Sequence, residues 1–105
     1  MSRTILQEQL FLDQNLSRTT LSSRFNVSKD QVSAAFVAGG TSLPAFISDC
    51  RLEYACRLLK EHPEMTIDEV SAQSGFTVRK SFSRSFKQKY ALTPSEYRQQ
   101  GGGMV

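Results

Sequence analysis

Apolar residues recur every three or four positions along most of the chain, and no stretch alternates apolar and polar residues. This spacing places apolar side chains on one face of an α-helix, whereas a β-strand would need alternation. Seven helices are predicted from it, with approximate bounds 3–13, 18–24, 29–38, 42–61, 67–74, 78–89 and 93–98. The pattern therefore predicts an all-α fold.

The ends of several predicted helices carry residues that favour a helix start or a tight turn. Ser28 is suited to cap the N-terminus of the third helix, and Thr66 with Glu69 forms a capping box for the fifth. Asn26 and Gly75 each follow a short helix, and both residue types tolerate the left-handed backbone of a tight turn. Each short helix is thus predicted to lead through a turn into a longer helix.

The helical period also predicts which residues face inward. They are Ile5, Leu6, Leu10, Leu12, Leu21, Val32, Ala35 and Phe36 before residue 42, then Leu43, Phe46, Ile47, Cys50, Tyr54, Leu58 and Leu59 in the long helix, and Ile67, Val70, Ser71, Phe82 and Phe86 after it. Hydrophobic residues make up 39% of the 105 residues, which is enough for a core but a thin one.

The order of these features repeats after about fifty residues. The matching positions are Leu21–Ser22 with Val70–Ser71, Asn26 with Gly75, Val32–Ser33 with Phe82–Ser83, Phe36 with Phe86, and Ser42–Pro44 with Thr93–Pro94. A short helix, a turn and a longer helix in each copy form a helix-turn-helix motif. Two such subdomains, residues 1–41 and 63–100, are predicted on either side of a linker helix at 42–62, with a flexible tail at 101–105.

The segment 78–89 contains five basic residues and no acidic residue. Phe82 and Phe86 are four residues apart and so share one helix face, which leaves the basic side chains on the other. The net charge of +3 says little alone, but residues 1–50 hold four basic and four acidic residues, whereas 51–105 hold nine and six. A basic outer helix after a turn fits the major groove of DNA. A plain helical bundle is the alternative interpretation.

Other chemistry has little support in the sequence. Cys50 and Cys56 have no metal-binding spacing and are predicted to be buried, reduced thiols. With one histidine, His62, and no nucleophile–base arrangement or phosphate loop, we expect no enzyme activity, no cofactor and no metal. No apolar run approaches a membrane span and no signal peptide is apparent, so a soluble, cytoplasmic protein with no membrane contact is predicted.

These features resemble the DNA-binding domain of the AraC/XylS family of bacterial transcription regulators. The matching motifs are Arg51-Leu52-x-x-Ala55-x-x-Leu58-Leu59, Ile67-x-x-Val70-Ser71-x-x-x-Gly75-Phe76, Phe82-Ser83-Arg84-x-Phe86-Lys87, and Thr93-Pro94-Ser95-x-Tyr97-Arg98. The resemblance extends from about residue 7 to residue 98. It implies a seven-helix fold, and members usually activate transcription by binding upstream of a promoter and contacting RNA polymerase.

The resemblance also implies which residues face the bases. In the first motif they are Lys29, Asp30, Ser33 and Ala34, and in the second Arg79, Lys80, Ser83 and Arg84. The segment itself adds Ser81 and Lys87, and Ser28 offers a cap near a phosphate. The sequence departs from the family pattern at Arg18, usually apolar, at Ala34, usually basic or polar, at 37–39, usually charged, and at Ala91, commonly Gly. The first motif has therefore lost much of its capacity to contact DNA.

Two hypotheses follow. The first is a sequence-specific double-stranded DNA binder that inserts two recognition helices into adjacent major grooves and regulates transcription, with the isolated domain monomeric. A linker of about twenty residues would span roughly 30 Å, close to the separation of successive grooves, about 34 Å. The second, motivated by the neutral first half, is a protein-interaction module of the same fold with weak or no DNA binding. The chain either acts alone or is the C-terminal part of a longer sensor protein.

Overall fold

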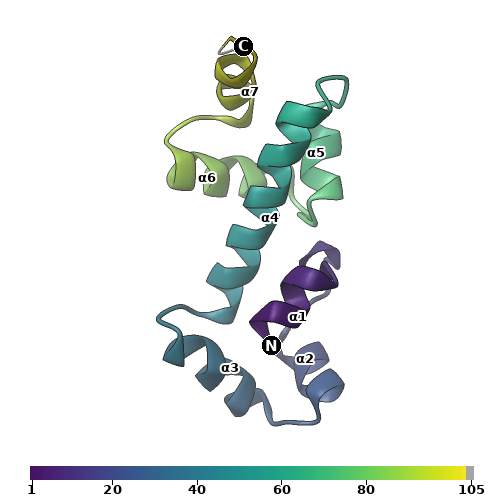
Figure 1. Cartoon of the computed structure of the whole chain (residues 1–105), viewed down its shortest axis with the longest axis vertical. Helices are drawn as coiled ribbons and strands as arrows, with labels where there is room; N and C mark the ends of the chain where they lie inside the picture. The colour runs from purple at the N-terminus through teal and green to yellow at the C-terminus, as the bar shows by residue number, and fades with distance from the viewer. Residues whose placement is uncertain (104–105) are drawn as a thin grey trace. The chain divides into compact units, whose positions relative to one another are not determined.

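The computed structural model describes residues 1–103, with the side chains of residues 1–100 (Figure 1). In this part of the chain it contains seven α-helices, one 3-10 helix and no strand, so the predicted all-α fold is confirmed. The helices are α1 (Ser2–Gln7), η1 (Leu10–Leu12), α2 (Arg18–Phe25), α3 (Lys29–Ala38), α4 (Leu43–Glu61), α5 (Ile67–Gln73), α6 (Arg79–Tyr90) and α7 (Pro94–Gly103). The chain divides into two compact units, Met1–Cys50 and the part from Arg51 onward, and α4 belongs to both.

In the first unit, side-chain caps fix where α2 and α3 begin. The predicted cap Ser28 is confirmed: its Oγ accepts from the backbone N–H of Gln31 at 3.1 Å, while the Gln31 Oε1 accepts from the N–H of Ser28 at 2.8 Å. Asn26 has φ 54° and ψ 48°, the left-handed conformation predicted for the turn. The N–H of Val27 then bonds the carbonyl of Ser22 at 3.1 Å, which closes the end of α2.

The predicted helix at 3–13 is wrong, because it is two elements. Gln9 has φ 54°, a left-handed conformation that cannot continue a helix, so α1 ends at Gln7 and η1 follows. The break turns Phe11 inward to 3% exposure, whereas Leu6, predicted to face inward, is 48% exposed. Ala35 was also predicted to face inward and is exposed, because Val32 and Phe36 alone occupy the buried side of α3.

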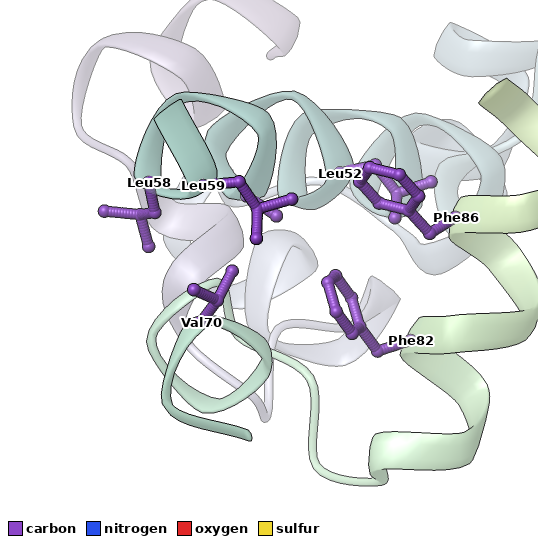
Figure 2. Packing of buried hydrophobic residues seen from close by; sticks show 7 residues of the cluster. Leu52, Leu58, Leu59, Val70, Phe82 and Phe86 are labelled. Atoms are coloured by element: carbon purple, nitrogen blue, oxygen red, sulfur yellow. The ribbon is translucent and has the colours of Figure 1, made fainter. Parts of the chain in front are cut away.

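The core of the second unit lies between α4, α5 and α6. Figure 2 shows Phe82 and Phe86 extending from α6 toward α4, with Val70 of α5 near Leu59. The full cluster is Leu52, Ala55, Leu58, Leu59, Val70, Phe82 and Phe86. The two phenylalanines are fully buried, and their ring centroids lie 5.8 Å apart in an edge-to-face arrangement. Burial of large aromatic side chains is a main source of stability in a domain this small.

The last helix is joined to the end of α4. Arg98 donates from Nε to the carbonyl of Leu59 at 3.3 Å and from Nη2 to the carbonyl of His62 at 3.2 Å. These carbonyls lie at or just beyond the C-terminus of α4, where no further turn of helix can pair them. The predicted end of the last helix near residue 98 is wrong, because α7 runs on to Gly103. It thus includes three residues of the predicted flexible tail, whose last two, Met104 and Val105, lie outside the described residues.

Candidate nucleic-acid interface

The outer face of α6 carries the basic side chains that the sequence singles out. Phe82 and Phe86 are 0% exposed, so the predicted buried face of this helix is confirmed. Lys80, Ser81, Arg84 and Lys87 are exposed on the other side, Arg79 is exposed at the start of the helix, and Ser83 is half-buried. The cap residue Val78 makes no side-chain hydrogen bond, and no acidic residue lies in the first turn. The face therefore has a strong local excess of positive charge.

Arg79, the first residue of α6, is held from two sides. Its Nε lies 3.1 Å from Oδ1 of Asp68 on α5, and its Nη1 donates to Oγ of Ser83 one turn further along α6. The Asp68 side chain is 82% exposed, so this ion pair contributes little to stability. Its effect is to hold the guanidinium between α5 and Ser83. Because a guanidinium can only donate, the Ser83 oxygen accepts and its own O–H is directed elsewhere.

An open hollow lies beside this face, with a volume of about 450 Å³. It is lined by Ser83, Arg84, Lys87, Gln88 and Thr93. The sequence alone does not associate Gln88 and Thr93 with the basic face, since Thr93 is recognisable only as the cap of α7. Two cations along an open concavity suit an anionic backbone that passes over the surface.

Thr93 and Glu96 form a complete capping box at this edge. The N–H of Thr93 donates to Glu96 Oε1 at 2.9 Å, and the N–H of Glu96 donates to Thr93 Oγ1 at 3.1 Å. The bond from the Thr93 backbone lowers the pKa of the Glu96 carboxyl below its ordinary value. At the far end of α6, Lys89 lies 3.7 Å from Glu53 and so neutralises an acid of α4. The basic surface therefore consists of the residues from Arg79 to Lys87.

The corresponding face of α3 is less charged. Lys29 and Asp30 are exposed at its start and have opposite charges, while Ala34 and Val37 occupy the positions that Arg84 and Lys87 have in α6. Val37 is 66% exposed. Ser28 takes part in the capping box with Gln31, so its hydroxyl already accepts a backbone hydrogen bond.

A second guanidinium lies against α3 in an unexpected way. Arg18, the first residue of α2, donates from Nη1 to Oγ of Ser33 at 3.2 Å. Arg24, near the other end of α2, instead pairs with Glu8, the residue that follows α1. The candidate residues of the first unit thus lie on α3 or at its N-cap, and those of the second unit lie on α6. Arg18, which was not among the residues predicted from the sequence, lies beside Ser33 of α3. The departure of Arg18 from the family pattern was the one signal available.

The two arginines of α4, Arg51 and Arg57, each lie near an aromatic side chain. The guanidinium groups of both lie over aromatic rings. The Arg51 carbon Cζ is 5.9 Å from the ring centroid of Phe76, and that of Arg57 is 5.3 Å from the ring of Tyr54. Such contacts stabilise a surface modestly.

A family model described as a helix-turn-helix domain matches residues 21–100. The chain belongs to the AraC/XylS-type helix-turn-helix family. The predicted resemblance is confirmed, and the basic face of α6 lies on the second helix of the second motif. Members of this family are DNA-binding regulators of transcription and not enzymes.

Relatives of this AraC/XylS-type domain are found in several bacteria. The HTH-type transcriptional regulator MtrA of Neisseria gonorrhoeae is 36% identical over 88 residues, which are 84% of this chain and 26% of MtrA. The C-terminal domain of the response regulator yesN from Fusobacterium nucleatum has a TM-score of 0.82 at 28% identity, with 92% of this chain and 93% of that chain covered. The C-terminal domain of AraT, a response regulator from Geobacillus stearothermophilus, has a TM-score of 0.84 at 26% identity, with 94% and 81% covered.

The AraC/XylS-type domain thus corresponds to about a quarter of the length of MtrA. Over the described residues, no helix is both long and apolar enough to cross a membrane. No group of three or more metal-ligating side chains was found in the same part of the chain. Cys50 and Cys56 are not joined by a disulfide. Cys50 is buried and Cys56 half-buried, so the prediction that both are buried holds for Cys50 alone.

Proposed function

We propose that this domain recognises a specific double-stranded DNA sequence, with α6 in one major groove and α3 in the next groove along the same face. The observation that carries the proposal is the division of α6 into two faces. Phe82 and Phe86 are buried on one side, while the exposed residues include four cations between Arg79 and Lys87 and the helix has no acidic residue. A helix with this division of faces places its charges where phosphates and base edges lie.

In this proposal each residue of α6 has a role set by its place. Arg79 and Lys80 are at the N-terminal end, where a recognition helix meets base edges, and an Arg that contacts a guanine discriminates by about 1–3 kcal/mol. Ser83 and Arg84 lie one turn further on and contact bases or a phosphate. Ser81 and Lys87 bind the phosphate backbone. In α3, Lys29, Asp30 and Ser33 make weaker contacts, and Asp30 can accept from a cytosine amine.

The length of α4 supports a site of two half-sites. It is unbroken over 19 residues, which corresponds to about 28 Å, and the sequence repeat places one motif before it and one after it. Successive major grooves on one side of B-DNA are about 34 Å apart. One chain could therefore contact two neighbouring grooves, and we propose that the isolated domain is a monomer that binds DNA as such.

Regulation would follow from occupancy near a promoter. We propose activation through contact with RNA polymerase, which the family resemblance implies, in keeping with the curated relative MtrA, named a transcriptional regulator. A reporter gene behind a promoter that carries the selected site should be activated when this protein is expressed. Repression of that reporter would contradict the activation part of the proposal and leave DNA binding intact.

Selection of bound duplexes from a random pool tests the central proposal. It should enrich one sequence with two blocks about one helical turn apart, and binding to it should weaken steeply as salt rises. Enrichment of no sequence at low salt would contradict the proposal. Sedimentation of the free domain should give the mass of one chain.

A charge-reversal pair then tests the surface. Lys80→Glu with Arg84→Glu should abolish binding, because it puts two negative charges against phosphates. Arg57→Glu with Lys60→Glu changes the net charge equally on α4 and should weaken binding about tenfold or less. Equal losses from the two pairs would show that general charge, rather than the face of α6, drives binding. Circular dichroism checks that both variants are folded.

One observation favours a second function. The outer face of α3 exposes Val37 at 66% together with Ala34 and Ala35, which is more typical of a protein contact than of a DNA contact. If this domain is a protein-interaction module, the pair Lys80→Glu with Arg84→Glu should leave partner binding unchanged. Val37→Asp should then abolish it.

A further inference from the structure

Ser33 and Ser83 occupy equivalent positions of the sequence repeat, and each accepts a hydrogen bond from an arginine. Arg79 reaches Ser83 along α6 itself, whereas Arg18 reaches Ser33 from the neighbouring helix α2, at 3.2 Å. The same polar pair is thus built in both motifs from different parts of the chain. A guanidinium on a recognition-helix serine is the feature that the two surfaces share.

Arg18 has no role in the core at its position. The second motif has Ile67 there, and Ile67 is half-buried against the core of its unit. Arg18 is exposed, and its guanidinium lies on the outside of α3. The replacement of an apolar residue by an arginine therefore moves this position from packing to the surface that carries Ser33.

The contact fixes the direction of the Ser33 hydroxyl. A guanidinium carries five N–H donors and no acceptor, so Ser33 Oγ must accept from Arg18, and its own O–H becomes a donor to a third group. Ser83 is arranged in the same way by Arg79. Arg18 also differs from Arg24 on the same helix, because Arg24 is paired with the carboxylate of Glu8, whereas Ser33 is neutral.

Resting on the function proposed above, we propose that Arg18 binds a backbone phosphate of the first half-site and at the same time sets Ser33 as a hydrogen-bond donor to a base. The first helix of a helix-turn-helix motif crosses the DNA backbone, which is where the first residue of α2 would meet a phosphate. The base opposite Ser33 must then present an acceptor. Guanine, adenine and thymine do so in the major groove, whereas cytosine presents its amine.

The experiment uses the whole chain and the site enriched from random DNA. Arg18→Ala should weaken binding about five- to tenfold, and the slope of log affinity against log salt should become shallower by about one, as expected for one lost phosphate contact. Arg18→Leu, which places an apolar residue where the second motif has Ile67, should lose the same affinity and the same salt slope as Arg18→Ala. Because an apolar residue suits this position in the second motif, such a loss would not be due to unfolding. Arg18→Lys should retain most of the slope.

Arg24→Ala is the matched control, because it removes the same charge from the same helix but from an exposed ion pair with Glu8. It should change affinity less than twofold and leave the salt slope unchanged, since exposed ion pairs contribute little. Four versions of the selected DNA site, each with a different base pair opposite Ser33, test the proposed role of Ser33 as a hydrogen-bond donor to a base. The wild type should disfavour cytosine there, and Ser33→Ala should remove that preference without a change in the salt slope.

The outcomes separate this inference from the function on which it rests. If the wild type selects no DNA sequence, the proposed function itself is contradicted. If the wild type binds and Lys80→Glu with Arg84→Glu abolishes binding, but Arg18→Ala matches the wild type or Arg24→Ala in affinity and slope, the proposed role of Arg18 is overturned.

Discussion

The two helix-turn-helix motifs of this chain are alike inside and different outside. Leu21 and Val70 are 0% exposed at one equivalent position, and Val32 and Phe82 are 0% exposed at another. The turns match as well, with a positive φ at Asn26 in the first motif and at Gly75 in the second. On the outer faces, by contrast, the first motif has Ala34 and Val37 at the positions where the second motif has Arg84 and Lys87.

The difference shows that the fold and the proposed DNA-contacting surface are encoded at separate positions. Interior positions are limited by close packing, so both copies keep a large apolar side chain there. Outer positions have no such limit and can lose charge without loss of the helix. A motif can therefore retain its structure while its contribution to binding falls, as we propose for α3.

The largest expected effect concerns the anchor of each recognition helix. Phe82→Ala should lower the free energy of unfolding by about 3–5 kcal/mol, because it removes a fully buried ring. Val32→Ala, at the equivalent position, deletes two methyl groups and should cost about 2 kcal/mol. Urea unfolding followed by circular dichroism measures both. A larger loss at Val32 would show that the first unit, and not the second, depends more on this anchor.

A gain of binding tests the outer faces directly. Ala34→Arg gives α3 the guanidinium that α6 has at Arg84, and it should raise affinity about five- to tenfold, in line with about 1–1.4 kcal/mol for one contact. Fluorescence anisotropy with the selected duplex measures it. Ala72→Arg adds the same charge to an exposed position of α5 and is the control. If both variants bind equally well, α3 makes no specific contact.

A smaller effect concerns the residue of positive φ that follows each longer helix. Gly40 with φ 82° and Ala91 with φ 61° each lie two residues before the cap of the next helix. An L-residue in this conformation costs about 1–2 kcal/mol, so Ala91→Gly should stabilise the fold by about 1 kcal/mol. Gly40→Ala should destabilise it by a similar amount through its positive φ alone, because an added Cβ meets no atom within 4 Å and so adds no clash. Thermal unfolding of both variants compares them, and shifts of the same sign would contradict the expectation.

The smallest expected effect is a difference in how the N-terminal caps of α4 and α7 respond to pH. The folded-state pKa of Glu96 is lowered, so its ionised form stabilises the cap of α7 at neutral pH. That contribution is lost as the pH falls below the ordinary carboxyl range toward the lowered pKa. Ser42, which caps α4, accepts from the N–H of Ala45 at 3.3 Å and has no carboxylate to titrate. Glu96→Gln should therefore reduce the loss of α7 amide protection at acid pH in hydrogen exchange, and leave α4 unchanged.

Much of the fold follows from local signals in the sequence. The capping boxes at Ser28 and Thr66, the turns at Asn26 and Gly75, and the buried pair on α6 all depend on residues a few positions apart. Such signals act through the backbone of one segment, so a period of three to four residues and a list of cap residues are enough to predict them. The break at Gln9 has no such signal, because glutamine is an ordinary helix former.

The candidate site could be predicted only where it depends on residues of a single helix. The exposed cations of α6 follow from one helix, whereas the pairs Arg79–Asp68 and Arg18–Ser33 join residues from different helices. Those pairs depend on how two helices pack and on side-chain rotamers, which a single sequence does not reveal. The sequence does mark Arg18 as a departure from the family pattern, but without coordinates the departure suggests only a weakened motif.

The bonds from Arg98 to the carbonyls of Leu59 and His62 set a lower limit on how far this chain can be shortened. They connect residues 39 and 36 positions apart, so the terminus of α4 is completed by a side chain near the other end of the sequence. A fragment that stops before Arg98 would retain every cation of α6 and lose this closure. The carbonyls of Leu59 and His62 would pair with water, and α6 would pack against a frayed end of α4.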